Sequence, residues 1–142
     1  MKEYNAPFFS LYENLYKTIK EEYEEKQALY LFRKIMETGL KKAYDTFGFK
    51  KGDPNNFAAT LEARDKAVGL LVKFPVISSN KIIYQFHTDP FPNLKGVVSH
   101  ELLDDTYINF KVKYLLGEDW SYKPTKHFWD GEPYTEFIIE KR

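Results

Sequence analysis

The spacing of apolar residues changes period three times along this chain, and these changes limit the folds open to it. Up to about residue 68, apolar residues recur with helical spacing. The segment Leu70–Thr88 is strand-like with a turn at 78–80, and helical spacing returns over Val97–Leu116. The segments Trp120–Trp129 and Glu132–Lys141 are again strand-like. This order predicts an α+β fold of N-terminal helices, a β-hairpin, a helix and a second β-hairpin, with about four strands in one antiparallel sheet.

The helical half carries its own start and stop signals. Ser10 and Glu13 have the spacing of a capping box, which predicts a first helix from about Leu11. The helical spacing of apolar residues continues to Phe47, which predicts two helices or one bent helix. A charged cluster lies near the expected break (Glu21, Glu22, Glu24 and Glu25). Asp53 before Pro54 predicts the N-cap of a further helix, to about residue 68.

The strand segments indicate which side chains face inward. Pro75 lacks an amide donor, so the first strand is expected at a sheet edge. In the second strand one face carries Ile82, Tyr84 and Phe86, and the other carries Ile83, Gln85 and His87. The dipeptide Asp130-Gly131 predicts a tight hairpin between the last two strands.

Length and composition bound the class of protein. The 142 residues predict a single domain, 1–142, with an N-terminal helical segment at 1–48 and an α+β ligand-pocket region at 49–142. Aromatic residues make up 18%, which suits a tyrosine-rich core or a ligand pocket. Lys plus Arg and Asp plus Glu are both 21, so no net charge favours nucleic acid or anionic lipid. Cysteine is absent, which excludes disulfides, zinc–thiolate sites and cysteine nucleophiles.

The sequence shows no targeting or nucleotide-binding signature. The first 16 residues lack the apolar core of a signal peptide, and no apolar run approaches the roughly 18 residues of a membrane span. We therefore expect a cytoplasmic protein without membrane or nucleic-acid partners. No glycine-rich phosphate loop and no Gly-x-Ser-x-Gly elbow occurs.

The strongest candidate for chemistry is the polar start of the helix near residue 100. His100 and Asp104 are four residues apart on one helix face, and Glu101 and Asp105 share the adjacent face. A histidine with an orienting carboxylate could act as a general base, or two such groups could form part of a metal site. No third ligand is visible, so we predict no metal and no cofactor. A solvated polar helix face remains the alternative.

Two other histidines are weaker candidates. His87 ends a strand before a proline-rich loop, where pockets often open, and it is also compatible with a hydrogen-bonded core histidine. His127 alternates with Thr125 and Lys123, which predicts an exposed strand face and a structural role.

The same element order, over roughly residues 29–139, resembles the family of L-2-amino-thiazoline-4-carboxylic acid hydrolases and, more distantly, 4-vinyl-reductase-type ligand-binding domains. Three stretches carry the resemblance: a strand entering a Pro-Phe loop (Ile82–Phe91), a polar helix start (Ser99–Glu101) and the C-terminal strands (Thr125–Ile138). Family members place cysteines before the Pro-Phe loop, near the polar helix and after a Gly-Asp turn. Here Tyr134 stands near the last of these positions and Glu132 replaces the turn aspartate, so ring opening by thiols is impossible in this chain.

The resemblance implies a hydrolase that acts on a small heterocyclic or amidine-like substrate. His100 or His87 would be the base, Asp104 or Glu101 would orient it, and aromatic residues would shape the pocket (Tyr84, Trp120, Trp129 and Tyr134). A non-catalytic domain that binds or senses a small molecule is the alternative, favoured by the missing cysteines. The apolar stripe of the N-terminal helices also suits a homodimer interface.

Overall fold

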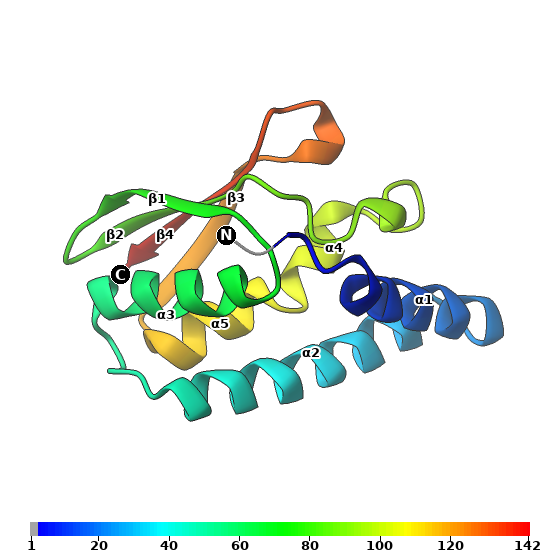
Figure 1. Ribbon diagram of the computed structural model, residues 1–142, viewed down its shortest axis with the longest axis horizontal. Coiled ribbons are helices and arrows are strands. Elements are labelled where there is room, and N and C mark those ends of the chain that lie inside the picture. The colour runs from blue at the N-terminus through cyan, green and yellow to red at the C-terminus, as the bar shows by residue number, and fades with distance from the viewer. Residues whose placement is uncertain (1–2) are drawn as a thin grey trace.

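The computed structural model describes residues 3–142, and helices cover one face of a sheet (Figure 1). Met1 and Lys2 of the predicted domain lie outside the described residues. The helices are α1 (Ala6–Glu22), α2 (Glu25–Phe47), α3 (Pro54–Ala67), α4 (His100–Asp105) and α5 (Ile108–Leu115), with short 3₁₀ turns η1 (Pro92–Leu94) and η2 (Phe128–Asp130). The strands are β1 (Val72–Ile77), β2 (Lys81–Phe86), β3 (Trp120–Lys126) and β4 (Thr135–Lys141).

The four strands form one antiparallel sheet in the order β1-β2-β4-β3, which confirms the predicted α+β class. The two central strands pair directly, with Ile82 opposite Ile139 and Tyr84 opposite Phe137. Burial alternates along β2, so the Ile82, Tyr84 and Phe86 side chains all point into the core as expected.

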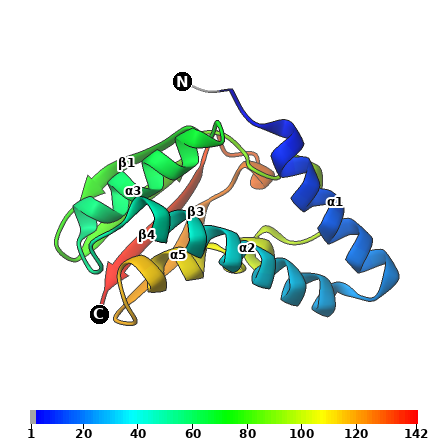
Figure 2. The same ribbon diagram turned by 60° about the horizontal axis from the view of Figure 1, so that its bottom comes forward.

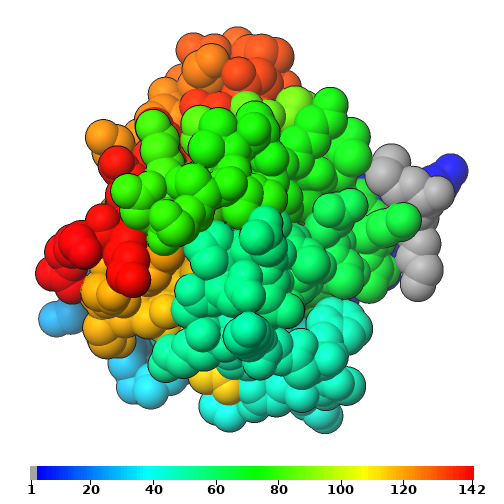
Figure 3. Space-filling view, turned by 90° about the vertical axis from the view of Figure 1, so that its left-hand side faces the viewer, coloured from blue at the N-terminus to red at the C-terminus, as the bar shows by residue number. Residues whose placement is uncertain are grey.

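The helices form two levels beneath the sheet. α3 packs against β1 and α5 against β3, while α2 runs below both helices and α1 packs on α2 (Figures 1 and 2). Figure 3 shows α3 lying directly under the β1–β2 hairpin, with the C-terminal end of β4 beside it. Within residues 3–142, no helix lies on the opposite face of the sheet.

Proline marks both sheet edges. Pro75 lies in β1 and Pro124 in β3, the two outer strands. The register of each strand shifts at its proline, between Lys73 and Val76 in β1 and between Pro124 and Lys126 in β3. A proline removes a ladder hydrogen bond, and an edge strand tolerates that loss best. The edge position predicted from Pro75 is confirmed.

Side chains cap the starts of α1 and α3, although the cap of α1 is not the predicted one. The predicted capping box at Ser10 and Glu13 is wrong, because α1 begins earlier and the Asn5 side chain accepts from the Phe8 amide. The buried Glu13 carboxylate instead accepts from the backbone and side-chain amides of Asn93. The Asp53 cap of α3 is confirmed, since its side chain accepts from the amide of residue 56.

The expected continuous helix over Val97–Leu116 is broken into α4 and α5. The Ser99 side chain caps α4 by accepting from the amide of residue 102. At the break, the Thr106 hydroxyl donates to the Leu103 carbonyl at 2.6 Å, and the Tyr107 backbone leaves helical geometry at φ −132°. The break turns the Tyr107 side chain into the core, where it is 4% exposed.

The second hairpin does not turn tightly at Asp130-Gly131, as had been predicted. Residues 127–134 form a longer connection that contains η2, and Gly131 closes this 3₁₀ turn in the left-handed region at φ 88°. The amide of Phe128 donates to the hydroxyl of Thr135, and the His127 side chain caps the turn. Local side-chain hydrogen bonds therefore override the two-residue hairpin signal.

Within residues 3–142, every helix is too short or too polar to cross a lipid bilayer.

Candidate functional site

Three segments converge beside the end of the sheet. α4 supplies His100 and Asp104, the η2 connection supplies His127 and Trp129, and the loop after β2 supplies Asp89. We call His100, Asp104 and His127 the histidine cluster. One potential ligand atom from each of the three lies within 4.8 Å of the others.

His127 lies inside the protein and not on an exposed strand face, so that prediction is wrong. Its residue is only 5% exposed, because the chain leaves β3 at Lys126 and folds into η2. Nδ1 accepts a hydrogen bond from the amide of Trp129 at 3.0 Å, so the proton of the neutral ring is on Nε2. Nε2 lies 3.1 Å from Oδ2 of Asp104.

One ring nitrogen of His100 is paired with carboxylates, and the other is buried without a hydrogen-bond partner among the described residues. Its Nε2 lies 2.8 Å from a carboxylate oxygen of Asp130 and 2.8 Å from one of Glu101, so Nε2 carries the proton. The ring stacks on His127 with centroids 4.0 Å apart. Nδ1 is buried and has no hydrogen-bond partner among residues 3–142. This arrangement leaves the Nδ1 lone pair free to accept a proton.

Asp104 is the second incomplete group of the cluster. The residue is 4% exposed, and Oδ1 accepts from the Tyr107 hydroxyl at 3.3 Å. Oδ2 faces His127 outside hydrogen-bond geometry and has no partner within the described part of the chain. Burial raises the pKa of the Asp104 carboxyl, and the nearby His127 ring opposes that shift.

The cluster is therefore rich in acceptors and poor in donors. Carboxylates of Glu101, Asp104 and Asp130 lie against the two imidazoles, and the Asp89 carboxylate accepts from the neighbouring indole of Trp129. A buried acceptor without a partner is costly, typically by about 1–3 kcal/mol, so such a site favours a ligand that brings donors or positive charge. A water, an amidine-like N–H group or a metal ion all meet this requirement.

The His127 tautomer discriminates between these ligands. A metal bound through Nε2 would need the proton on Nδ1, where the amide of Trp129 already donates. The observed hydrogen bond therefore favours an N–H donor or a water over a metal ion in this arrangement.

A small cavity adjoins the cluster and is anchored by Asp89. The indole N–H of Trp129 donates to this carboxylate at 2.8 Å, and its other oxygen accepts from the amide of Phe91. The cavity volume is about 10 Å³, close to the roughly 10–15 Å³ that one water requires. Its polar lining comes from Asp89, Asp104, Tyr107, His127, Trp129 and Thr135.

The other predicted site residues are distributed between two further places. His87 bonds to Gln85 at 2.9 Å and stacks on Tyr134 at 5.0 Å, away from the histidine cluster. Burial and nearby Lys73 lower the pKa of His87. Trp120 is in the core at 2% exposure, so of the predicted aromatic residues only Trp129 touches the cluster.

Tyr84 belongs to a separate buried polar group. Its hydroxyl donates to Oδ2 of Asp65 at 2.6 Å and accepts from Nζ of Lys111 at 3.1 Å. Lys111 lies 3.7 Å from Oδ1 of Asp65, and each of these two residues is 3% exposed. Burial lowers the pKa of Lys111, while the Asp65 charge opposes the shift.

Of the residues at or beside the histidine cluster, the sequence predicted His100, Glu101, Asp104 and Trp129 as site residues. It did not predict several residues that contact them. His127 carried a usable signal, since it stands two residues before Trp129 at the end of a strand. Asp89 also had one, because an aspartate before Pro-Phe often caps a turn. No local pattern indicated Asp65 or Lys111, which come from different helices.

No family model matches this chain, and no curated protein matches it. The resemblance to the aminothiazoline carboxylate hydrolases stays a prediction from sequence pattern.

Proposed function

We propose that the protein hydrolyses a C–N bond in a small heterocyclic or amidine-like substrate at the histidine cluster. The observation that carries the proposal is the pair of buried acceptors without partners, Nδ1 of His100 and Oδ2 of Asp104. An amidine presents N–H donors to a carboxylate, and a nucleophilic water presents an O–H donor to an imidazole. The two unsatisfied atoms thus match the two reactants.

Each residue has a defined role in this scheme. Asp104 binds a substrate N–H, and Nδ1 of His100 takes a proton from water as the water oxygen attacks the C=N carbon. The imidazolium that forms is stabilised by Asp130 and Glu101, which already lie 2.8 Å from Nε2. With the substrate bound as its amidinium, the C=N electron pair moves onto its nitrogen during the attack. His100 then returns the proton to the departing nitrogen, the C–N bond breaks with its electron pair on that nitrogen, and the hydroxyl of the intermediate loses its second proton to solvent as the carbon becomes a carbonyl.

His127 is a positioning residue in this scheme. Its Nδ1 accepts from the Trp129 amide at 3.0 Å, and its Nε2 carries the proton and lies 3.1 Å from the Asp104 carboxylate, a charge contact outside hydrogen-bond geometry. It has no free lone pair for proton transfer. Its role is to stack on His100 and hold Asp104 in place.

The test is a turnover assay with L-2-amino-thiazoline-4-carboxylate and a panel of small cyclic amidines, followed by mass spectrometry for a product heavier by one water. We expect His100→Ala to lower kcat about 10²- to 10⁴-fold, the usual contribution of a general base. Asp119→Asn, on the surface and paired with Lys141, is the matched control and should retain full activity. Full activity in His100→Ala, or loss confined to His87→Ala, would overturn the assignment.

A binding or sensing domain without turnover is the second candidate. The observation that favours it is an apolar cavity of about 40 Å³ between α1, α2, α3 and α5. A ligand that raises the melting temperature and is recovered unchanged would support this alternative.

A further inference from the structure

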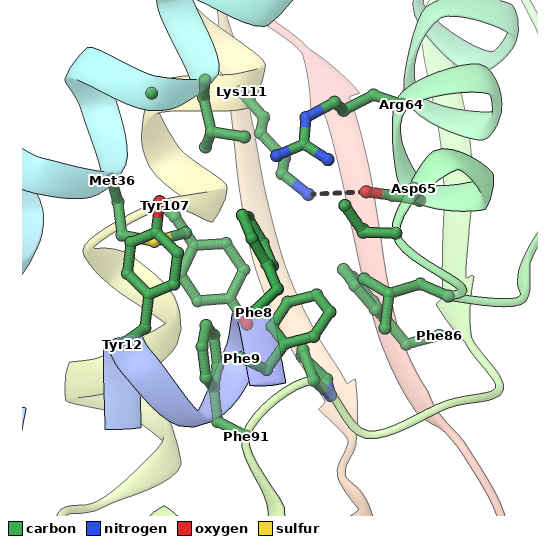
Figure 4. Close-up of a pocket in the computed structure, with 15 residues that line it drawn as sticks. Phe8, Phe9, Tyr12, Met36, Arg64, Asp65, Phe86, Phe91, Tyr107 and Lys111 are labelled. Atoms are coloured by element: carbon green, nitrogen blue, oxygen red, sulfur yellow. Dashed lines mark ion pairs between the residues drawn. The ribbon is translucent and has the colours of Figure 1, made fainter. Parts of the chain in front are cut away.

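The apolar cavity of about 40 Å³ has a buried floor and a more exposed mouth. Figure 4 shows the residues that line it. The floor includes Phe86, Phe91, Tyr107 and Lys111, all buried. The mouth consists of half-buried or exposed residues from three helices and the segment after α3, namely Phe8, Tyr12, Gly39, Arg64 and Val68. The walls are mostly apolar and include six aromatic side chains, so the cavity suits an apolar ligand body.

Charge is confined to one end of this cavity. Figure 4 shows Lys111, Arg64 and Asp65 together at that end, with Lys111 paired to Asp65. Lys111 Nζ makes one hydrogen bond, to the Tyr84 hydroxyl at 3.1 Å, and its distance of 3.7 Å to Asp65 exceeds hydrogen-bond range. An ammonium has three donors, so it can bond a further acceptor from the cavity.

Arg64 adds a second cation without a matching acid. Among residues 3–142, no carboxylate lies within ion-pair distance of its guanidinium, which sits 5.6 Å from the ring centre of Phe8. Arg64 and Lys111 line the same end of the cavity, and the charge of Arg64 adds to burial in lowering the pKa of Lys111. Two cations and one carboxylate leave this end of the cavity with one net positive charge.

We infer that this cavity binds a small monocarboxylate with an apolar body, its carboxylate on Lys111 and Arg64 and its body against the aromatic walls. The carboxylate would neutralise the excess positive charge and accept hydrogen bonds from the unused N–H groups of both side chains. The inference does not depend on hydrolysis at the histidine cluster, because it concerns binding alone. It adds a ligand class to the binding alternative and a recognition element to the hydrolase.

Cavity size sets the first ligands to try. A volume of about 40 Å³ is room for roughly three waters, so acids of a few heavy atoms fit with little rearrangement. Larger acids require the half-buried Phe8 and Tyr12 side chains to move aside at the mouth. Tyr107 lines both this cavity and the smaller one beside the cluster, so the two sites share a wall.

The test is a titration with butyrate and with its neutral isostere butyramide, followed by NMR chemical shifts. We expect butyrate to bind at least about tenfold more tightly, as a charge-assisted contact provides, with shifts at Phe8, Tyr12 and Met36. Arg64→Gln should weaken butyrate about tenfold or more. Lys66→Gln on the same helix makes the same charge change at an exposed position outside the cavity lining and should leave affinity unchanged.

The outcomes separate this inference from the proposed function. Equal affinity for butyrate and butyramide, equal weakening by Arg64→Gln and Lys66→Gln, or displacement of butyrate by equimolar inorganic phosphate would overturn the monocarboxylate site. Lys111→Met, first shown to be folded by its circular dichroism, should abolish the preference for the anion, and a retained preference would contradict the inference. Butyrate binding in a protein with no hydrolytic activity would support the cavity site and remove the hydrolase proposal.

Discussion

Two buried polar groups lie in the core of this protein, and they are completed to different extents. In the Asp65–Tyr84–Lys111 group, both carboxylate oxygens face a cation or a hydroxyl of the same chain. In the histidine cluster, His100 and Asp104 each retain one buried acceptor without a partner. The carboxylate of the first group is satisfied within the chain, while Lys111 keeps donors that face the apolar cavity. The second is complete only with a donor from outside, which is the property expected of a reaction site.

The largest effect should come from breaking the completed group. Lys111→Met leaves the 3% exposed Asp65 as an uncompensated buried charge, so we expect a loss of about 3–5 kcal/mol in the free energy of unfolding. The double variant Lys111→Met, Asp65→Asn should recover most of it, because no charge remains buried. Urea unfolding of the three proteins measures both values. If Lys111→Met lost less than about 1 kcal/mol in the free energy of unfolding, the buried charge of Asp65 would not depend on Lys111 for compensation.

Two tyrosine hydroxyls provide a matched comparison of the groups. Tyr84→Phe removes bonds to Asp65 at 2.6 Å and to Lys111 at 3.1 Å, so we expect a loss of about 2–3 kcal/mol. Tyr107→Phe removes a single bond to Asp104 at 3.3 Å, and about 1 kcal/mol should be lost. Thermal and urea unfolding give the two values side by side. A larger loss in the free energy of unfolding for Tyr107→Phe than for Tyr84→Phe would contradict the view that the Asp65–Tyr84–Lys111 group is hydrogen-bonded more completely than the histidine cluster.

The Asp104 titration should appear in the pH dependence of stability. Burial raises the folded pKa of this carboxyl above its ordinary 3.8, so the folded protein holds the proton more tightly than the unfolded chain. The stabilisation is full below pH 3.8 and is lost as pH rises through the folded pKa. Asp104→Asn lacks this titration, so its stability relative to wild type should improve as pH rises through that window.

Urea unfolding between pH 4 and pH 8 checks the Asp104 prediction, with the exposed Glu140→Gln as control. A difference between Asp104→Asn and wild type that stays constant across this range would contradict a raised folded pKa.

The smallest effects should come from the exposed carboxylates that hold His100. Glu101 and Asp130 side chains are 61% and 63% exposed, and exposed ion pairs contribute about 0–1 kcal/mol. Glu101→Gln and Asp130→Asn should each change the free energy of unfolding by less than about 1 kcal/mol. On the proposed function each should still lower kcat, because the base loses part of its orientation. A large stability change with intact activity would assign these residues to the scaffold.

The sequence predicts those features that depend on local pattern. The alternation in Ile82, Tyr84 and Phe86 predicted the inward face of β2, and Pro75 predicted a sheet edge. The Asp53 cap also follows from two adjacent residues, Asp53 and Pro54. Each of these features is determined by the geometry of a single element.

The unpredicted features depend on partners distant in sequence or on competing local hydrogen bonds. His127 alternates with polar residues, yet η2 turns it inward because Nδ1 caps the turn. Thr106 breaks a helix whose apolar spacing is continuous, through a bond from its hydroxyl to a backbone carbonyl. The pairing of Lys111 with Asp65 joins α5 to α3, and no periodicity of either helix reveals it.

The central claim is that Nδ1 of His100 carries an unpaired lone pair. Its most direct test is the tautomer of His100, measured by long-range ¹H–¹⁵N correlation NMR of the imidazole nitrogens at pH 8.5. Both His100 and His127 should carry their proton on Nε2, and Nδ1 of His100 should have the shift of a nitrogen with a free lone pair. An Nδ1–H tautomer at His100 would contradict the account, because the base would then point its lone pair at Asp130 and Glu101 instead of at a substrate.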